Sequence, residues 1–139
     1  DEDSPMKNDL RARRRMPTAH LKSSIRVSKG FIDSIWEEVR PNDFSLFGMK
    51  LKTNRAYKAN DKITLSLNLQ LDMGTISIEK ITARIVRVNK LVGFYEYGVE
   101  FDKKVVGNIE GLTAMNLLRI ENILDKQELL SVKITQKIA

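Results

Sequence analysis

The 139 residues suit one domain with a substantial core, and 42% apolar with 30% charged residues is the composition of an ordinary soluble globular protein. No apolar run approaches the roughly 20 residues that span a membrane. The absence of cysteine excludes disulfides and thiol chemistry and agrees with a reducing cytoplasm, where we expect the protein to act. The net charge of +6 is concentrated near the N-terminus, which favours an anionic partner such as a nucleotide, a nucleic acid or an acidic surface.

Residues 1–18 have no hydrophobic periodicity and contain the segment RARRR, Arg11 to Arg15. We predict that they form a flexible basic arm. Guanidinium groups bind phosphate oxygens through paired hydrogen bonds and match the O6 and N7 acceptors of guanine. Taken alone, however, the run is better explained as a solvated basic arm.

Alternation of apolar and polar residues dominates residues 19–104 and predicts a β-domain, either an antiparallel barrel or a sandwich. The clearest run is ITLSLNLQL, whereas ISIEKITARIVRV changes parity between Ile78 and Ile81 and predicts a β-bulge near Glu79–Lys80. Closure into a barrel would remove exposed strand edges. The alternating runs are 21–27, 49–52, 63–71, 76–88 and 95–101, with turn-forming segments at 58–61, 72–74 and 89–93.

Residues 105–139 change character and predict a C-terminal helix followed by a tail. We expect the helix at about 108–126, with Asn108 as its N-cap. Its apolar stripe would cover one end of the barrel. The last segment, LLSVKITQKIA, fits either a strand or a continued helix. The stripe consists of Ile109, Leu112, Leu117, Ile120 and Leu124.

The sequence gives little support for an enzyme, and we expect no catalytic residues, no metal site and no cofactor. His20 is the only histidine, and without cysteine it cannot build the common zinc sites. Glu37 and Glu38 are adjacent, so in a strand they point to opposite faces and cannot act as a pair. Trp36 lies in a predicted strand and is more typical of a core or barrel rim than of a stacking platform.

A second constellation is the segment D-x-S-x-x-G, formed by Asp43, Ser45 and Gly48. An Asp carboxylate can accept hydrogen bonds from the N1–H and amino group of a guanine, and a Ser hydroxyl can donate to a phosphate or a base. Gly48 permits a left-handed backbone or a close approach of the ligand. A strand–turn–strand with an Asx-type hydrogen bond explains the segment equally well. The intervening Phe44 and Leu46, together with Met49, would anchor the loop in the barrel.

Together, the arginine run and this loop resemble the PilZ domain family. An R-x-x-x-R segment at a flexible N-terminus precedes a strand and then D-x-S-x-x-G. The late segment YGVEF resembles the G-[VI]-x-F pattern of the family, which Gly98, Val99 and Phe101 match. The resemblance covers about residues 11–103.

The resemblance implies a mainly β fold, a six-stranded antiparallel β-barrel of the split-barrel type with a C-terminal helix. It also implies a receptor for cyclic di-GMP, a ligand that the family often binds as an intercalated dimer. Arg11 and Arg15 would bind phosphates and guanine edges, Asp43 and Ser45 would hold a guanine, and Gly48 would shape the loop. Arg13 and Arg14 are secondary candidates, because the arm holds four arginines.

The function implied by the resemblance is a conformational switch. Ligand binding would fold the arm across the barrel and present a new surface to an effector protein or domain, with motility, exopolysaccharide or biofilm formation as outputs. Two alternatives remain: a small barrel that binds single-stranded nucleic acid, and a non-binding interaction module that forms a homo-oligomer through its C-terminal helix. We expect no nucleic acid partner, because aromatic residues make up only 6% of the chain.

Overall fold

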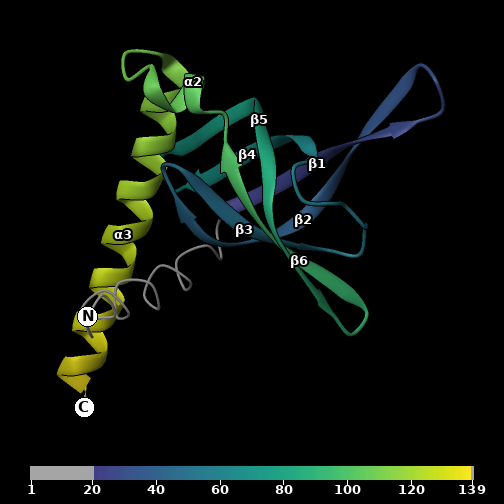
Figure 1. Ribbon diagram of the computed structural model, residues 1–139. Coiled ribbons are helices and arrows are strands. Elements are labelled where there is room, and N and C mark those ends of the chain that lie inside the picture. Colours follow the sequence, from purple (N-terminus) through teal and green to yellow (C-terminus); the bar gives the residue numbers. More distant parts are fainter. Residues whose placement is uncertain (1–20, 139) are drawn as a thin grey trace, which may run out of the picture.

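The computed structural model describes residues 21–138, in which six strands close into one antiparallel barrel (Figure 1). Around the barrel the strands follow the order β1-β2-β3-β6-β5-β4. This confirms the predicted six-stranded antiparallel barrel with a C-terminal helix. The elements are β1 (Leu21–Lys29), β2 (Asp33–Ser45), β3 (Gly48–Thr53), β4 (Lys62–Leu71), β5 (Gly74–Leu91), β6 (Phe94–Phe101), α2 (Lys103–Gly107) and α3 (Leu112–Ile138).

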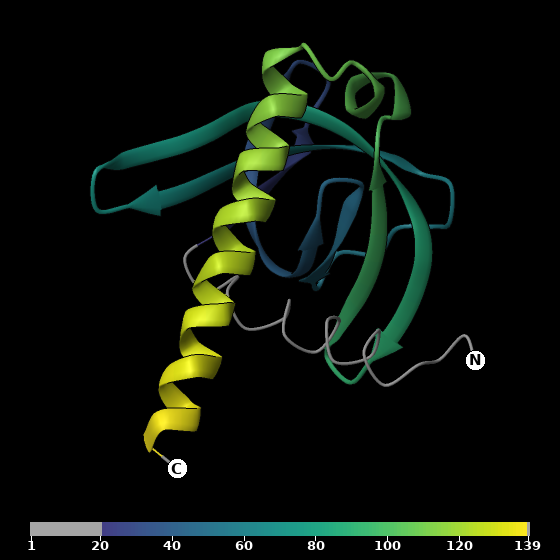
Figure 2. The ribbon, with the colours of Figure 1, turned by 90° about the vertical axis from the view of Figure 1, so that its left-hand side faces the viewer.

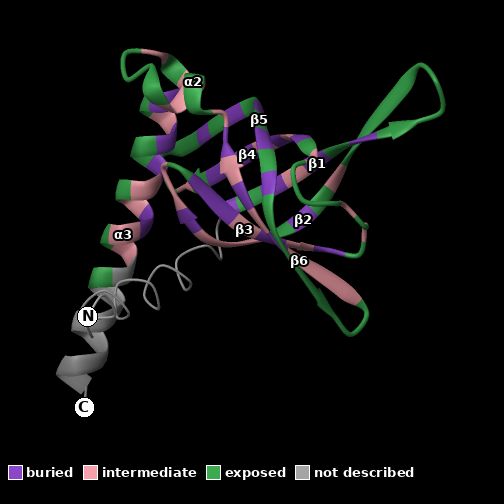
Figure 3. Cartoon of the chain, viewed as in Figure 1, coloured by how far each residue is buried: buried purple, intermediate pink, exposed green. Residues whose placement is uncertain are grey.

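Strict alternation of burial along the strands builds the core (Figure 3). In β4 the side chains of Ile63, Leu65, Leu67 and Leu69 are buried inside the barrel, and the polar residues between them face outward. In β6, Tyr97, Val99 and Phe101 are buried, while Tyr95 on the same face is half-buried. The alternation of apolar and polar residues in the sequence therefore predicted correctly which side chains of these strands point into the barrel.

The predicted bulge near Glu79–Lys80 is confirmed. Leu65 of β4 pairs with Ile81 of β5, whereas Leu67 pairs with Ile78, so the register shifts between these two pairs. One extra residue on β5 restores the inward orientation of its apolar side chains on both sides of the shift. The change of apolar parity between Ile78 and Ile81 in the sequence is caused by this register shift.

The C-terminal helix differs from the prediction in both ends and in part of its apolar stripe. Asn108 caps the C-terminus of the short helix α2, and α3 begins at Leu112. At its other end α3 continues to Ile138, so the last segment is helical. Ile109 lies before α3 and is 78% exposed, and Leu112, in its first turn, is 73% exposed. Neither side chain faces the barrel: Ile109 precedes the helix, and Leu112 is rotated by roughly 140° around the helix axis from the buried Leu117.

The middle of α3 lies across one end of the barrel (Figure 2). Leu117, Ile120 and Leu124 are buried and belong to the same core as the strands. These side chains recur at helical spacing, so one face of α3 closes the barrel end. The prediction that the helix covers an end of the barrel is confirmed for this part of the stripe.

The β1–β2 hairpin extends beyond the barrel on the side away from α3 (Figure 1). β1 pairs with β4 only from Leu21 to Ile25, but it pairs with β2 up to the pair Lys29 and Asp33. Past Ile25 the two strands of this hairpin therefore support only each other. Phe31 and Ile32, at its tip, are fully exposed.

Candidate functional site

The β2–β3 loop, which holds the D-x-S-x-x-G segment, is a tight hairpin turn built by Ser45. The Ser45 hydroxyl accepts a hydrogen bond from the backbone N–H of Phe47 at 3.2 Å and lies 3.4 Å from the Gly48 carbonyl oxygen. A serine that bonds a backbone N–H two residues ahead forms an ST-turn. The turn is thus a serine turn and not the Asx-type turn considered from the sequence.

Three apolar side chains and one helix residue fix this loop to the barrel. Phe44 and Met49 are buried in the core, and Leu46 packs against it, as predicted. The backbone N–H of Leu46 also donates a 2.9 Å hydrogen bond to the Glu121 carboxylate of α3. The loop is consequently connected to both the barrel and the C-terminal helix.

Gly48 is required by close packing against β6. A Cβ placed on Gly48 would lie 2.1 Å from the carbonyl oxygen of Val99, which is an impossible contact. The expected left-handed backbone is found at Asp43, which has φ 50°, and not at Gly48. The role of Gly48 in the described structure is to let β3 approach β6, which fixes the end of the loop.

Asp43 combines a left-handed backbone with a carboxylate that is partly exposed. It lies within the irregularity of the β2–β3 pairing between Asn42 and Ser45, and its positive φ is uncommon for a residue with a side chain. Asp43 is partly exposed, and within residues 21–138 its carboxylate has no hydrogen-bond or ion-pair partner. Strained residues persist where the surrounding structure holds them, and they are common at binding sites.

The barrel surface beside Asp43 carries basic residues that sequence reasoning missed. Asn42 pairs with Lys50 across β2 and β3, Lys50 pairs with Gly98 of β6, and Gly98 pairs with Arg87 of β5. Paired residues share a face, so Lys50 and Arg87 flank the bare backbone of Gly98 on the outside of the barrel. Only the cross-strand register brings these residues together, and nothing in their sequence spacing indicates it.

The predicted arginines Arg11, Arg13, Arg14 and Arg15 lie outside the described residues, as does His20. The described part of the chain begins at Leu21, the first residue of β1. In the β1–β2 register, Ser23 pairs with Val39, and extending this register by two residues places Leu21 level with Pro41, two residues before Asp43. The start of β1 therefore lies beside the D-x-S-x-x-G segment.

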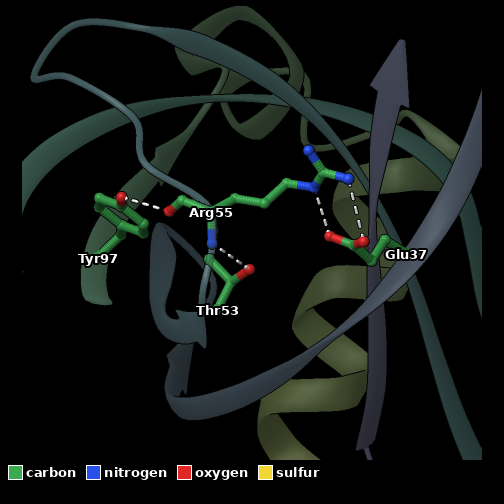
Figure 4. A network of polar contacts seen from close by, with 4 residues as sticks. All are labelled: Glu37, Thr53, Arg55 and Tyr97. Atoms are coloured by element: carbon green, nitrogen blue, oxygen red, sulfur yellow. Dashed lines mark hydrogen bonds and ion pairs between the residues drawn. The ribbon is translucent and has the colours of Figure 1, made fainter. Parts of the chain in front are cut away.

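A polar network closes the barrel end opposite α3 (Figure 4). Arg55 donates two hydrogen bonds to Glu37, at 2.6 Å and 3.2 Å, and these hold the pKa of the Glu37 carboxyl below its usual value. The buried Tyr97 hydroxyl donates to the carbonyl of Arg55 and accepts from the N–H of Tyr57, both at 2.7 Å. Burial raises the pKa of both tyrosines. This network binds the β3–β4 loop, residues 54–61, to the barrel. It also gives the Glu37 carboxylate a structural role, as the partner of Arg55.

Within 21–138, no three His, Cys, Asp or Glu side chains gather as a metal site. None of the helices in this part of the chain is long and apolar enough to cross a membrane.

Comparison with known families assigns the chain to one of them. The strands define a small β-barrel closed by a helix, and the family model of the PilZ domain matches residues 9–115. The chain therefore belongs to the PilZ domain family, whose domains are cyclic di-GMP receptors and not enzymes. The match spans both the arginine run and the D-x-S-x-x-G segment. No curated protein matches the chain.

Proposed function

We propose that this PilZ domain binds cyclic di-GMP between the N-terminal arm and the barrel surface around Asp43. The observation that carries the proposal is the unpartnered Asp43 carboxylate, held in a left-handed conformation beside the start of β1. A carboxylate in this position can accept the N1–H and amino hydrogen bonds of a guanine. Ser45 and Gly48 support it by fixing the loop, and in the ligand-bound state the Ser45 hydroxyl can exchange its turn contacts for a ligand contact.

Chain geometry supports a shared site for the arm and the loop. Five residues separate Arg15 from Leu21, so Arg15 lies at most about 20 Å from the start of β1. Arg11, Arg13, Arg14 and Arg15 supply more guanidinium groups than one ligand molecule needs, which suits an intercalated ligand dimer with four phosphates. Lys50 and Arg87 add positive charge on the barrel side of the same site.

Isothermal titration calorimetry with cyclic di-GMP tests this assignment. Removal of a charged hydrogen-bonding group typically weakens an interaction by about 1.5–3 kcal/mol, so Asp43→Ala and Arg15→Ala should each raise the Kd by about tenfold or more. Asp72→Ala is a matched control, because Asp72 is an exposed residue in the β4–β5 turn and should leave the Kd unchanged. Unchanged affinity in both site variants would exclude the site.

The arm would act as the moving part of the switch. Its like charges repel one another without ligand, and the two phosphates of each cyclic di-GMP molecule would neutralise them and fold the arm onto the barrel. Trypsin cleaves after arginine, so ligand should slow cleavage at Arg11–Arg15 in the native protein. Cleavage at the same rate with saturating ligand would contradict the ordering of the arm.

The two alternatives are separated by the same titration with an oligonucleotide at two salt concentrations. Nucleic acid affinity should fall steeply with salt. If no binding heat is measured with either cyclic di-GMP or the oligonucleotide, the interaction module is favoured. The exposed aromatics Phe31, Trp36 and Phe47 do not form one stacking surface for nucleic acid, because Phe47 lies in the β2–β3 loop, at the other end of β2 from Phe31 and Trp36. The effector partner, the output in motility or exopolysaccharide synthesis, and a homo-oligomer through the C-terminal helix remain predictions.

A further inference from the structure

A basic cleft opens in the barrel wall where β1 and β4 part. The last β1–β4 pair is Ile25 and Leu65; beyond it, β1 continues with β2 and the first residues of β4 pair only with β5. The β3–β4 loop closes the back of the gap. The resulting cleft has a volume of about 810 Å³, and Ser34, the residue of β2 that lines it, lies nine residues along the strand from Asp43, roughly 30 Å of strand. It is therefore separate from the proposed cyclic di-GMP site.

Three cations from three different elements line this cleft: Arg26 of β1, Arg55 of the β3–β4 loop and Lys62 of β4. None of the lining residues is acidic. Glu37 lies nearby, but Arg55 already holds both of its oxygens. Glu37 therefore balances Arg55, and the net positive charge of the cleft comes from Arg26 and Lys62.

The cations of the cleft retain bonding capacity. The Arg26 Nε donates to Ser34 Oγ at 2.9 Å, which orients the guanidinium and leaves its two terminal nitrogens without a partner among the described residues. Within the same residues, Lys62 has no ion-pair or hydrogen-bond partner. Guanidinium and ammonium groups arranged in this way bind phosphate oxygens.

The hairpin that forms one wall of the cleft ends in an unpartnered apolar tip (Figures 1 and 3). Phe31 and Ile32 are 107% and 94% exposed, and Trp36 is 44% exposed on the same hairpin face as Arg26. Ser28 lines the cleft, so the tip at Phe31 extends about 10 Å beyond it. We call this segment, residues 29–36, the tip hairpin. Lys29 and Asp33, which pair at its turn, balance each other in charge.

We propose that the tip hairpin and the basic cleft together dock on an anionic membrane surface. The cleft would bind the phosphate of a lipid headgroup, and Phe31 and Ile32 would enter the boundary between headgroups and acyl chains. Trp36 would lie at the headgroup level, where the amphipathic indole ring is favoured. Stable peripheral binding requires two signals, an apolar anchor and a basic patch, and both lie at this corner of the molecule.

Phe31 and Ile32 make this partner fit better than a soluble anion. A soluble phosphate compound needs the cleft alone and gives no reason for two large apolar side chains at the end of a hairpin that extends into solvent. Charge complementarity selects an anionic surface, and the apolar tip selects one with a hydrocarbon interior. The proposal does not depend on cyclic di-GMP binding, since none of these residues lies in the proposed ligand site.

Trp36 is the only tryptophan of the chain and reports directly on this surface. The full chain should sediment with vesicles of equal parts phosphatidylglycerol and phosphatidylcholine but not with phosphatidylcholine alone. Its fluorescence should shift to the blue on binding. Because the N-terminal arginines can also attract anionic vesicles, sedimentation without a fluorescence shift would overturn the proposal.

Matched variants separate the two signals. The double variant Phe31→Ser with Ile32→Ser changes no charge and should weaken vesicle binding by about tenfold or more, while Met73→Ser at the exposed β4–β5 turn should not. Lys62→Glu should weaken binding by about tenfold, while Lys126→Glu on α3 should have little effect. Circular dichroism would verify that each variant is folded.

Three results would overturn the proposal. One is the absence of sedimentation with the anionic vesicles. Another is full binding by the tip double variant. The third is binding of glycerol phosphate to the cleft, lost in Lys62→Glu, without any binding to vesicles. That outcome would identify the cleft as a site for a soluble anion. An unchanged Kd of the tip variant for cyclic di-GMP would confirm that the two sites are independent.

Discussion

Tyr97 is the residue that joins the barrel core to the β3–β4 loop. Its ring is fully buried, and its hydroxyl donates a hydrogen bond to the Arg55 carbonyl (Figure 4) and accepts one from the Tyr57 N–H. In Tyr97→Phe, the Tyr57 N–H and the Arg55 carbonyl would lose their partner, so the free energy of unfolding should fall by about 1–3 kcal/mol. Urea unfolding measures this change.

Tyr95→Phe is the matched control for this variant. The Tyr95 ring stacks on Tyr97 with centroids 5.8 Å apart, but Tyr95 is only half-buried and takes no part in the network that binds the loop. Removing its hydroxyl should change stability by a few tenths of a kcal/mol at most. Equal losses in both variants would show that the Tyr97 hydroxyl does not hold the loop.

The same tyrosines predict an alkaline limit to stability. Burial raises the pKa of Tyr57 and Tyr97 in the folded state, so the folded protein binds their protons more tightly than the unfolded chain does. Their contribution is complete below the unfolded value of about 10 and is lost as the pH rises through the folded values. The unfolding free energy should therefore decline above about pH 10, and less steeply in Tyr97→Phe. Equal slopes in the two proteins would contradict the assignment to Tyr97.

Sequence reasoning at the residue scale selected Asp43, Ser45 and Gly48 as candidate site residues, but it did not give their local geometry. The left-handed conformation lies at Asp43, and Gly48, for which a left-handed backbone or a close approach was considered, is needed because β6 is too close for a Cβ. The contact that decides this joins residues 48 and 99, which are far apart in the sequence. The sequence shows which types of residue occupy the loop, whereas the contact between Gly48 and Val99 is known only from the fold.

The β2–β3 loop and α3 are coupled through one hydrogen bond, from the Leu46 N–H to Glu121 at 2.9 Å. This bond is the polar link between the proposed ligand loop and the C-terminal helix, so it offers a route for ligand binding to affect α3. Glu121→Ala should destabilise the protein by about 1–2 kcal/mol and speed hydrogen exchange at the Leu46 amide. NMR hydrogen exchange measures the amide directly.

Glu121→Gln is the control, because its amide oxygen can accept the same hydrogen bond without the charge. It should restore most of the protection of Leu46. If Glu121→Ala exchanges at the native rate, the loop is held by Phe44 and Met49 alone, and the coupling to α3 is absent.

The sequence predicted elements well where periodicity is long and poorly where it is short. The strand ITLSLNLQL and the bulge opposite it follow from period two. In contrast, α2 has only five residues and cannot show a helical repeat. The sequence therefore predicts Asn108 as the N-cap of the C-terminal helix, whereas in the structure it caps the end of α2. The tip hairpin was missed for a related reason: apolar residues such as Phe31 and Ile32 fit the pattern of a buried strand, and only the topology places them in solvent.

The whole molecule depends on side chains from α3 as well as from the strands. A barrel of six strands leaves its ends open, and α3 closes one end with Leu117, Ile120 and Leu124. Because these side chains belong to the same core as Ile25 and Leu65, barrel and helix should unfold together and not as separate units. A change in the packing of the barrel core would therefore be transmitted to α3 through these three side chains.

The adjacent pair Leu117 and Leu118 tests this shared core. Leu117 is fully buried, whereas Leu118, one position along α3, is 44% exposed. Leu117→Ala should reduce the free energy of unfolding by about 2–5 kcal/mol because it leaves a cavity at the closed end of the barrel. Leu118→Ala should cost less than about 1 kcal/mol, since the side chain is already partly in water. The helical circular dichroism signal in the far ultraviolet and the tyrosine signal in the near ultraviolet, which includes the buried Tyr97, should change in one transition in both variants. If Leu117→Ala instead melts the helix at a lower urea concentration than the barrel, α3 is a separately folding element and not part of the core.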